Sequence, residues 1–298
     1  MNQIDVLPTA EEKRAAWLEA RRGAIGASEV AAIIGVSPWA TPWEVWAEKR
    51  GLLESFDNPA TSAGRALEPV VLDYAEKNLG ELVRDVRVKH HSLPLASTCD
   101  ARVLSTGCPV EAKTTGITGP IVGDWGDELT DQIPDYYLVQ VHAQLMCTGT
   151  DLAYLFALLP GRGFCEFRIE SNETFNEHVG NILSDWWERH IVQGNEPSLT
   201  VMPSLEIIRR LKKTPNKMIE ASPFFEAALK LREEAKAAEK LAKEQVEEIE
   251  AKLLIELGDA EAATLSDGRT FTYLETSRRG CTVEPCKYRS IKVKKGKS

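Results

Sequence analysis

The 298-residue sequence predicts a mixed α/β domain of about 200 residues followed by a helical C-terminal extension. Two observations lead to this prediction. Amphipathic helical patterns are interspersed with short β-branched segments up to about residue 195, and one long charged helical pattern dominates the remainder. With 43% hydrophobic residues, the chain can bury one large core or two smaller ones.

Four helices are expected before residue 80, over residues 11–22, 27–35, 41–50 and 62–79. The third has the clearest start, because Thr41 can cap it, Pro42 suits the first helical position and Glu44 completes a capping box. The fourth contains Pro69, where a kink is expected.

From residue 82 the pattern changes to short β-branched segments separated by turn residues, which predicts an antiparallel meander. The expected strands are LVRDVRVKH, LPLAST, ARVL and PVEAK. A helix between Pro134 and Gly149 should follow, then the strands LAYLFALLPG and FCEFRIE and a helix over residues 173–193.

Prolines in a linker place the domain at residues 1–202 and the extension at residues 203–298. Within the extension we expect a long amphipathic helix over residues 223–257, a hairpin turned at Asp267-Gly268 and a basic tail. The apolar residues of the helix recur about every 3.7 residues, which fits a nearly straight helix better than a strict coiled coil.

The net charge of −9 is unevenly distributed. Residues 276–298 carry eight Lys or Arg and one acidic residue, so the rest of the chain holds 28 basic and 44 acidic residues, a net charge of −16. An acidic body cannot bind a polyanion over its whole surface, so nucleic acid would contact a channel, a pocket or the tail. A purely solubilising tail is the alternative.

The six cysteines lack a CxxC pair, so neither a zinc site nor a disulfide framework is indicated and reduced thiols are expected. The apolar runs are too short to span a bilayer and no signal-peptide pattern is present. These features predict a cytoplasmic protein with no membrane partner.

The segment CPVEAKTT, residues 108–115, carries the main chemical signal. Side chains on a strand alternate faces, so Glu111 and Lys113 point the same way. Asp100 is expected at the end of a preceding strand, and a hairpin turn at residues 105–107 would bring its carboxylate near Glu111. Two carboxylates suit Mg²⁺ or Mn²⁺, and a lysine beside them can orient an attacking water. A solvated strand edge is the alternative.

A carboxylate followed by Glu-x-Lys on a strand is the signature of the PD-(D/E)xK nucleases, although Cys99 replaces the motif's proline. Three further stretches occur in the order found in one of their families: residues 21–51, 63–76 and 133–149. Over about residues 15–195 the chain therefore resembles the YqaJ-like viral recombinases, relatives of phage lambda exonuclease. The resemblance implies a restriction-endonuclease-like core, with a mixed central sheet flanked by helices.

The resemblance also implies roles for residues on the strands. Asp100 and Glu111 match the metal-binding carboxylates of the family, and Lys113 matches its active-site lysine. A backbone carbonyl, of Val110 or Ala112, would add a metal ligand, and the strand period favours Ala112.

Further matches lie on helices. Glu68 matches a glutamate that helps to build the metal site, with a solvated helix residue as the alternative. Gln140 matches a motif glutamine near the metals and is counted among the catalytic residues. Tyr137 and Gln144 share its helix face, so they could face the cleft or belong to an ordinary polar face.

The stretch RRGAIGASE resembles the segment that captures the 5′-terminal phosphate in the exonuclease. Arg21 would supply a bidentate fork and Ser28 a hydroxyl near a helix start, with Arg22 as a neighbouring alternative. Without the resemblance, Ser28 reads as an N-cap and Arg21 as a surface arginine.

The function implied is a Mg²⁺-dependent 5′-to-3′ exonuclease that acts on double-stranded DNA ends and leaves 3′ single strands for phage-type recombination. Two ions are expected, and Mn²⁺ could substitute. The resemblance further implies a homotrimeric ring, a single-strand annealing protein as partner, and a phage or prophage origin in a bacterial cytoplasm. The alternatives are an endonucleolytic or structure-specific DNase and a non-catalytic recombination assembly factor.

Overall fold

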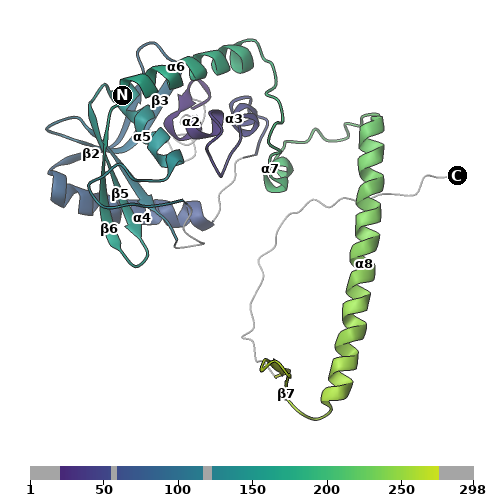
Figure 1. The fold of residues 1–298 in the computed structure, drawn as a ribbon. Helices are drawn as coiled ribbons and strands as arrows, with labels where there is room; N and C mark the ends of the chain where they lie inside the picture. Colours follow the sequence, from purple (N-terminus) through teal and green to yellow (C-terminus); the bar gives the residue numbers. More distant parts are fainter. Residues whose placement is uncertain (1–20, 55–58, 117–122, 275–298) are drawn as a thin grey trace, which may run out of the picture. The chain divides into compact units, whose positions relative to one another are not determined.

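A six-stranded mixed sheet forms the centre of the first of two units, residues 1–212 and 213–298 (Figure 1). The computed structural model describes residues 21–54, 59–116 and 123–274. The strands of the sheet are β1 (Ile25–Gly26), β2 (Leu82–Lys89), β3 (Leu95–Val103), β4 (Pro109–Thr114), β5 (Leu152–Leu159) and β6 (Gly163–Glu170).

The predicted antiparallel meander is confirmed, because β2 and β4 both pair antiparallel with β3. The strands expected at LPLAST and ARVL are one continuous strand, β3, in which buried Cys99 and Ala101 alternate with the more exposed Thr98 and Asp100. β4 pairs parallel with β5, β5 pairs antiparallel with β6, and β1 runs parallel to β3. The sheet is therefore mixed, as expected.

Helices cover both faces of this sheet. Those of the first unit are α2 (Ala27–Ile33), α3 (Pro42–Lys49), α4 (Pro59–Leu79), α5 (Asp135–Thr148), α6 (Glu173–Trp187) and α7 (Leu205–Arg209). Leu155 of β5 belongs to the core under α5, whereas the next residue, Phe156, belongs to the core under α4. The predicted α/β class, a sheet flanked by helices, is confirmed.

Local signals explain several helix ends. Glu44 donates its N–H to Thr41 Oγ1 at 3.3 Å and Thr41 donates to Glu44 Oε2 at 2.6 Å, which is the predicted capping box. Gly149 ends α5 in the left-handed conformation. The helix expected to reach residue 193 ends at Trp187 and continues as a π-helical segment, Glu188–Val192. The helix expected over residues 11–22 lies almost wholly outside the described residues.

The first unit extends beyond the predicted boundary at residue 202. Leu211 forms an isolated β-bridge with Leu53, and Ile207 and Ile208 of α7 pack against the core. Arg210 also contacts Glu48 at 3.1 Å. Because of these contacts, the unit ends after Lys212.

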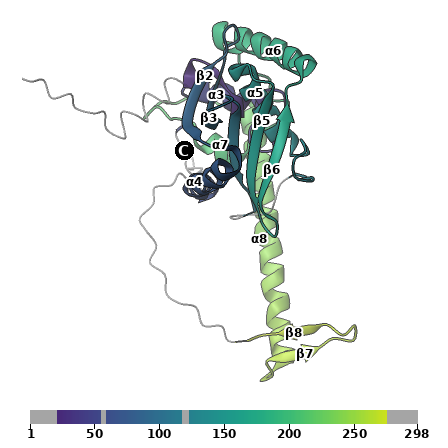
Figure 2. The ribbon, with the colours of Figure 1, turned by 90° about the vertical axis from the view of Figure 1, so that its left-hand side faces the viewer.

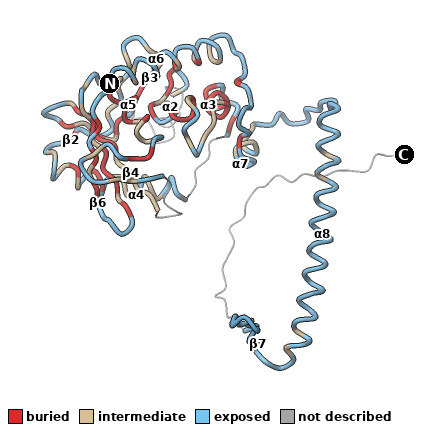
Figure 3. Tube along the Cα trace, in the orientation of Figure 1, coloured by how far each residue is buried: buried red, intermediate tan, exposed pale blue. Residues whose placement is uncertain are grey.

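The second unit contains α8 (Pro223–Leu257) and a hairpin, β7 (Ala262–Thr264) and β8 (Thr270–Thr272), seen in Figure 2. Both agree with the expected elements, and Gly268 takes a positive φ of 86° in the turn. None of the side chains of α8 is buried, as the tube in Figure 3 shows. The predicted basic tail falls among residues 275–298, outside the described part. No helix in the described ranges is long and apolar enough to cross a bilayer.

Candidate active site

Asp100 and Glu111 lie at the same level on neighbouring strands. Ala101 pairs with Val110 and Arg102 with Pro109, so the same register continued by one residue sets Asp100 opposite Glu111. Asp100 is inside β3 rather than at the end of a strand, because β3 does not break there. Its Oδ2 accepts a hydrogen bond of 2.8 Å from the Ala112 N–H. The predicted meeting of the two carboxylates is thus a consequence of the strand register.

Glu111 is 2% exposed and accepts hydrogen bonds from three side chains. Gln140 Nε2 donates to its Oε1 at 2.6 Å, Lys113 Nζ contacts the same oxygen, and Gln144 Nε2 contacts Oε2. Gln140 and Gln144 are one turn apart on α5 and therefore face the sheet together. The carboxylate is consequently held by both β4 and α5.

Lys113 remains a cation in this setting. Burial lowers the pKa of its ammonium, but the carboxylates of Glu111 and Asp100 outweigh this effect, and the net pKa is raised. Its Nζ also lies 4.9 Å from the centre of the Tyr137 ring, a cation–π contact. A permanently charged lysine acts by electrostatics and orientation rather than as a proton acceptor.

Asp100 and Glu68, two further acidic groups that interact with Lys113, also have raised pKa values, which in a carboxyl group favours the neutral form. Burial, followed by repulsion from Glu111, raises the pKa of Asp100 well above its ordinary value. Burial also raises the pKa of Glu68, with further contributions from Asp85 and Glu111. Carboxylates therefore crowd this part of the fold more than Lys113 alone can neutralise.

A cavity of about 640 Å³ collects most of the predicted site residues. The predicted residues that line it are Arg21, Ser28, Glu68, Asp100, Glu111, Lys113 and Gln140. Ser28 is an exposed residue in the first turn of α2, whose N-cap is Gly26, so the N-cap interpretation of Ser28 is wrong.

Two predicted cleft residues are not part of the cavity lining. Gln144 is fully buried and its side chain contacts the Glu111 carboxylate. The Tyr137 ring faces the Lys113 ammonium and belongs to an aromatic group that includes Trp125 and Tyr136. The Ala112 N–H binds Asp100, and its carbonyl as a metal ligand remains a prediction.

The cavity also contains residues that sequence reasoning missed: Thr61, Arg65, Asp85, Arg87 and Thr98. Arg65 is three residues before Glu68 on α4, so helical spacing from Glu68 could have indicated it. The β2–β3 register sets Asp85 opposite Asp100, since Arg84 pairs with Ala101 and Val86 with Cys99. Asp85 has a φ of 56°, a conformation that aspartate tolerates better than most residues and that no sequence pattern revealed.

The donor set fits a hard divalent cation. In the described part of the chain, no three His, Cys, Asp or Glu side chains converge closely enough to hold a metal alone. Mg²⁺ is commonly bound by one or two carboxylates, with water and phosphate oxygens as its other ligands. Asp100 and Glu111 can provide such a pair. A cation there would relieve the repulsion by Glu111 that adds to burial in raising the pKa of Asp100.

Comparisons with known proteins show what this part of the chain is similar to. Residues 16–151 match the model of the YqaJ-like viral recombinase domain. The uncharacterized protein YqaJ of Bacillus subtilis (strain 168) is 28% identical over 217 residues, which cover 70% of this chain and 66% of YqaJ, slightly less than two thirds of its length.

Two solved structures are also similar. One is LHK-Exo, an alkaline exonuclease from Laribacter hongkongensis, at 19% identity and a TM-score of 0.48, over 60% of this chain and 93% of that one. The other is a phage-related exonuclease from Haemophilus somnus 129PT, at 14% identity and a TM-score of 0.43, over 58% and 96%. Residues 16–151 are thus similar to the YqaJ-like viral recombinase domain, the resemblance that the sequence motifs indicate.

Proposed function

We propose that this protein is a divalent-cation-dependent nuclease that degrades double-stranded DNA from its 5′ ends. The observation that supports this most is one cavity lined by Asp100, Glu111 and Lys113 together with Arg21 and Ser28. The first three suit phosphodiester hydrolysis, and the last two suit a terminal phosphate. The similarity of residues 16–151 to a viral recombinase domain supports DNA as the substrate.

The residues of the cavity divide the chemical work. Asp100 and Glu111, with Glu68 beside them, would hold the cation, which when bound supplies Lewis-acid activation of the phosphate. The Lys113 ammonium would orient the attacking water and offset the charge that develops on the phosphate. Gln140 and Gln144 hold the Glu111 carboxylate by hydrogen bonds from α5.

DNA in a cavity also agrees with the charge of the chain. Arg21, Arg65 and Arg87 line the cavity of a protein whose first 275 residues have a net charge of −16. Polyanion binding would thus be confined to this site and to the basic tail. By resemblance we further propose a trimeric ring, a single-strand annealing protein that receives the 3′ strands, and action in the bacterial cytoplasm.

The test compares linear duplexes that carry a 5′ phosphate or a 5′ hydroxyl with supercoiled plasmid, in Mg²⁺ or EDTA. We expect the phosphorylated duplex to be degraded fastest, and only with the cation. Lys113→Ala should lower the rate by about 10², the effect of losing one electrostatic stabiliser. Lys77→Ala, at an exposed position in the last turn of α4 away from the cavity, is the control.

Other results would support a different function for this protein. Linearised plasmid would indicate an endonuclease, and intact substrates under all conditions would indicate a binding or assembly factor. A normal rate for Lys113→Ala would remove this lysine from the mechanism.

A further inference from the structure

A buried ion pair lies beside the cavity, between α2 and α3. Glu29 Oε2 is 2.6 Å from Lys49 Nζ, and the two side chains are only 9% and 3% exposed. Burial lowers the pKa of Lys49, while Glu29 acts in the opposite direction. Buried ion pairs give little stability compared with apolar residues of similar volume, because both charges lose their hydration. Stability alone therefore does not explain this pair.

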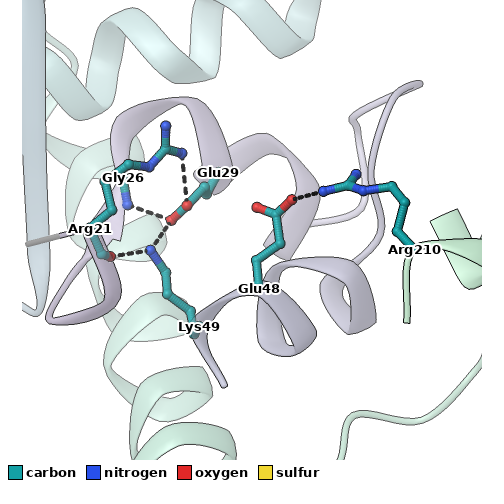
Figure 4. A network of polar contacts seen from close by, with 6 residues as sticks. All are labelled: Arg21, Gly26, Glu29, Glu48, Lys49 and Arg210. Atoms are coloured by element: carbon teal, nitrogen blue, oxygen red, sulfur yellow. Dashed lines mark hydrogen bonds and ion pairs between the residues drawn. The ribbon is translucent and has the colours of Figure 1, made fainter. Parts of the chain in front are cut away.

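Both members of the pair also hold Arg21, at two different points (Figure 4). Glu29 Oε1 accepts a hydrogen bond of 3.0 Å from Arg21 Nη2. Lys49 Nζ donates a hydrogen bond of 2.6 Å to the Arg21 carbonyl oxygen. The backbone and the guanidinium of Arg21 are thus fixed by one network.

The same network fixes the chain that leads from Arg21 to Ser28. The Gly26 N–H donates to Glu29 Oε2 at 2.7 Å, so this oxygen binds both the start of α2 and Lys49. Gly26, Arg21 and Ser28 all line the cavity, whereas Glu29 and Lys49 do not. The ion pair therefore lies behind a wall whose exposed groups include a guanidinium and a hydroxyl.

We propose that Glu29 and Lys49 are positioning residues that set the Arg21 guanidinium for binding a 5′-terminal phosphate. This inference rests on the proposed function and adds two residues to it. An arginine pays side-chain entropy when it is immobilised on a ligand, so a side chain already held in place binds a phosphate with less loss. Neither Glu29 nor Lys49 has to touch the DNA.

The experiment measures binding rather than cleavage. Fluorescence anisotropy in EDTA would compare duplexes that differ only in a 5′ phosphate or a 5′ hydroxyl. The Kd of the 5′-hydroxyl duplex divided by that of the 5′-phosphate duplex reports the phosphate contact. Wild-type protein should favour the phosphate. Lys49→Met should lower this ratio about tenfold, the loss of roughly one charged hydrogen bond. Its affinity for the 5′-hydroxyl duplex should change little.

Matched variants separate positioning from general damage. Glu48→Gln changes the adjacent residue of α3, whose carboxylate contacts Arg210 instead of Arg21, and should leave the ratio unchanged. Lys49→Arg keeps the charge and should retain most of the preference. In an Arg21→Ala background, Lys49→Met should have no further effect on the ratio, because the two changes remove one interaction.

Two results would overturn the inference. One is a full phosphate preference in Lys49→Met. The other is a fall in the Kd ratio that is equally large when Lys49→Met is made in wild-type protein and in Arg21→Ala, which would show that Lys49 does not act through Arg21. Glu29→Gln, which keeps side-chain volume, must give the same loss and replaces Lys49→Met if that variant fails to fold. Equal binding of both duplexes by the wild type would instead refute the phosphate assignment of the proposed function, and the variants are not needed to see it.

Discussion

Glu111 receives more hydrogen bonds than either of the other two motif residues. Its two oxygens bind donors from β4 and α5, so rotation of the carboxylate would break contacts in two elements. Gln144 lowers the stability of this arrangement, since its Oε1 is buried without a hydrogen-bond partner among the described residues and has lost its hydration. The helical period predicts that Gln140 and Gln144 lie on the same face of α5, but it does not predict how deeply each side chain is buried. The sequence could therefore not show that one lines the cavity and the other does not.

We expect His142 to make the stability of the domain depend on pH. Its side chain is 7% exposed against Phe175, and burial lowers its pKa. Because the folded-state pKa is lower than the unfolded one, the unfolded state binds more protons between the two values. The free energy of unfolding should therefore be unaffected by His142 above its unfolded-state pKa of about 6.5. It should decline as the pH falls from that value toward the lower folded-state pKa.

The measurement is the free energy of unfolding in urea between pH 7.5 and 5. His142→Phe should flatten the decline in this range, and His178→Phe, at an exposed position on α6, should not. A decline of the same size in His142→Phe and wild type would assign the pH dependence to other groups.

Among the elements, α7 shows best where sequence patterns fail. No helix was predicted for these five residues, because their core partners are distant in the sequence. Ile207 and Ile208 pack against a cluster that includes Leu53, about 150 residues earlier. The β3 strand was divided in two for a related reason, since the expected strands LPLAST and ARVL leave out Cys99 and Asp100. In the structure β3 continues through both residues, with Cys99 buried and Asp100 partly exposed. The helices α3 and α5 were predicted closely because their end signals are local: a capping box at the start of α3 and the left-handed Gly149 after α5.

Two truncations test the role of α7. A chain ending at Lys212 should fold like the first unit, whereas a chain ending at Pro203 loses Ile207, Ile208, Leu211 and the partner of Glu48. Losing partly buried aliphatic side chains should cost on the order of 3 kcal/mol, which lowers Tm by roughly 10 °C in a domain of this size. Equal Tm values in thermal denaturation would show that α7 does not stabilise the unit.

At the scale of the whole molecule, charge separates the tail from the rest. Residues 276–298 carry a net charge of +7, against −16 for the preceding residues. If the tail contacts DNA, removing it should weaken binding and reduce the slope of log K against log salt concentration. A scrambled tail of the same composition should preserve the slope, because the effect depends on charge rather than order.

Duplex binding by the full chain, the chain without residues 276–298 and the scrambled chain, at several salt concentrations, would measure this effect. An unchanged slope after deletion would mean that the tail does not touch DNA. The role of these residues was the least predictable from the sequence, since charge indicates the kind of partner but not where the partner binds.

The register of β3 and β4 has a consequence for how this site can vary among relatives. Asp100 and Glu111 face each other because residues on both strands pair one to one up to the turn at residues 104–107. Lengthening the turn would leave the two carboxylates opposed, whereas inserting one residue within either strand would rotate a carboxylate to the opposite face, which packs under α4. Insertions and deletions should therefore accumulate in the turn. The number of residues between aspartate and Glu-x-Lys can then differ between sequences whose sites have the same geometry.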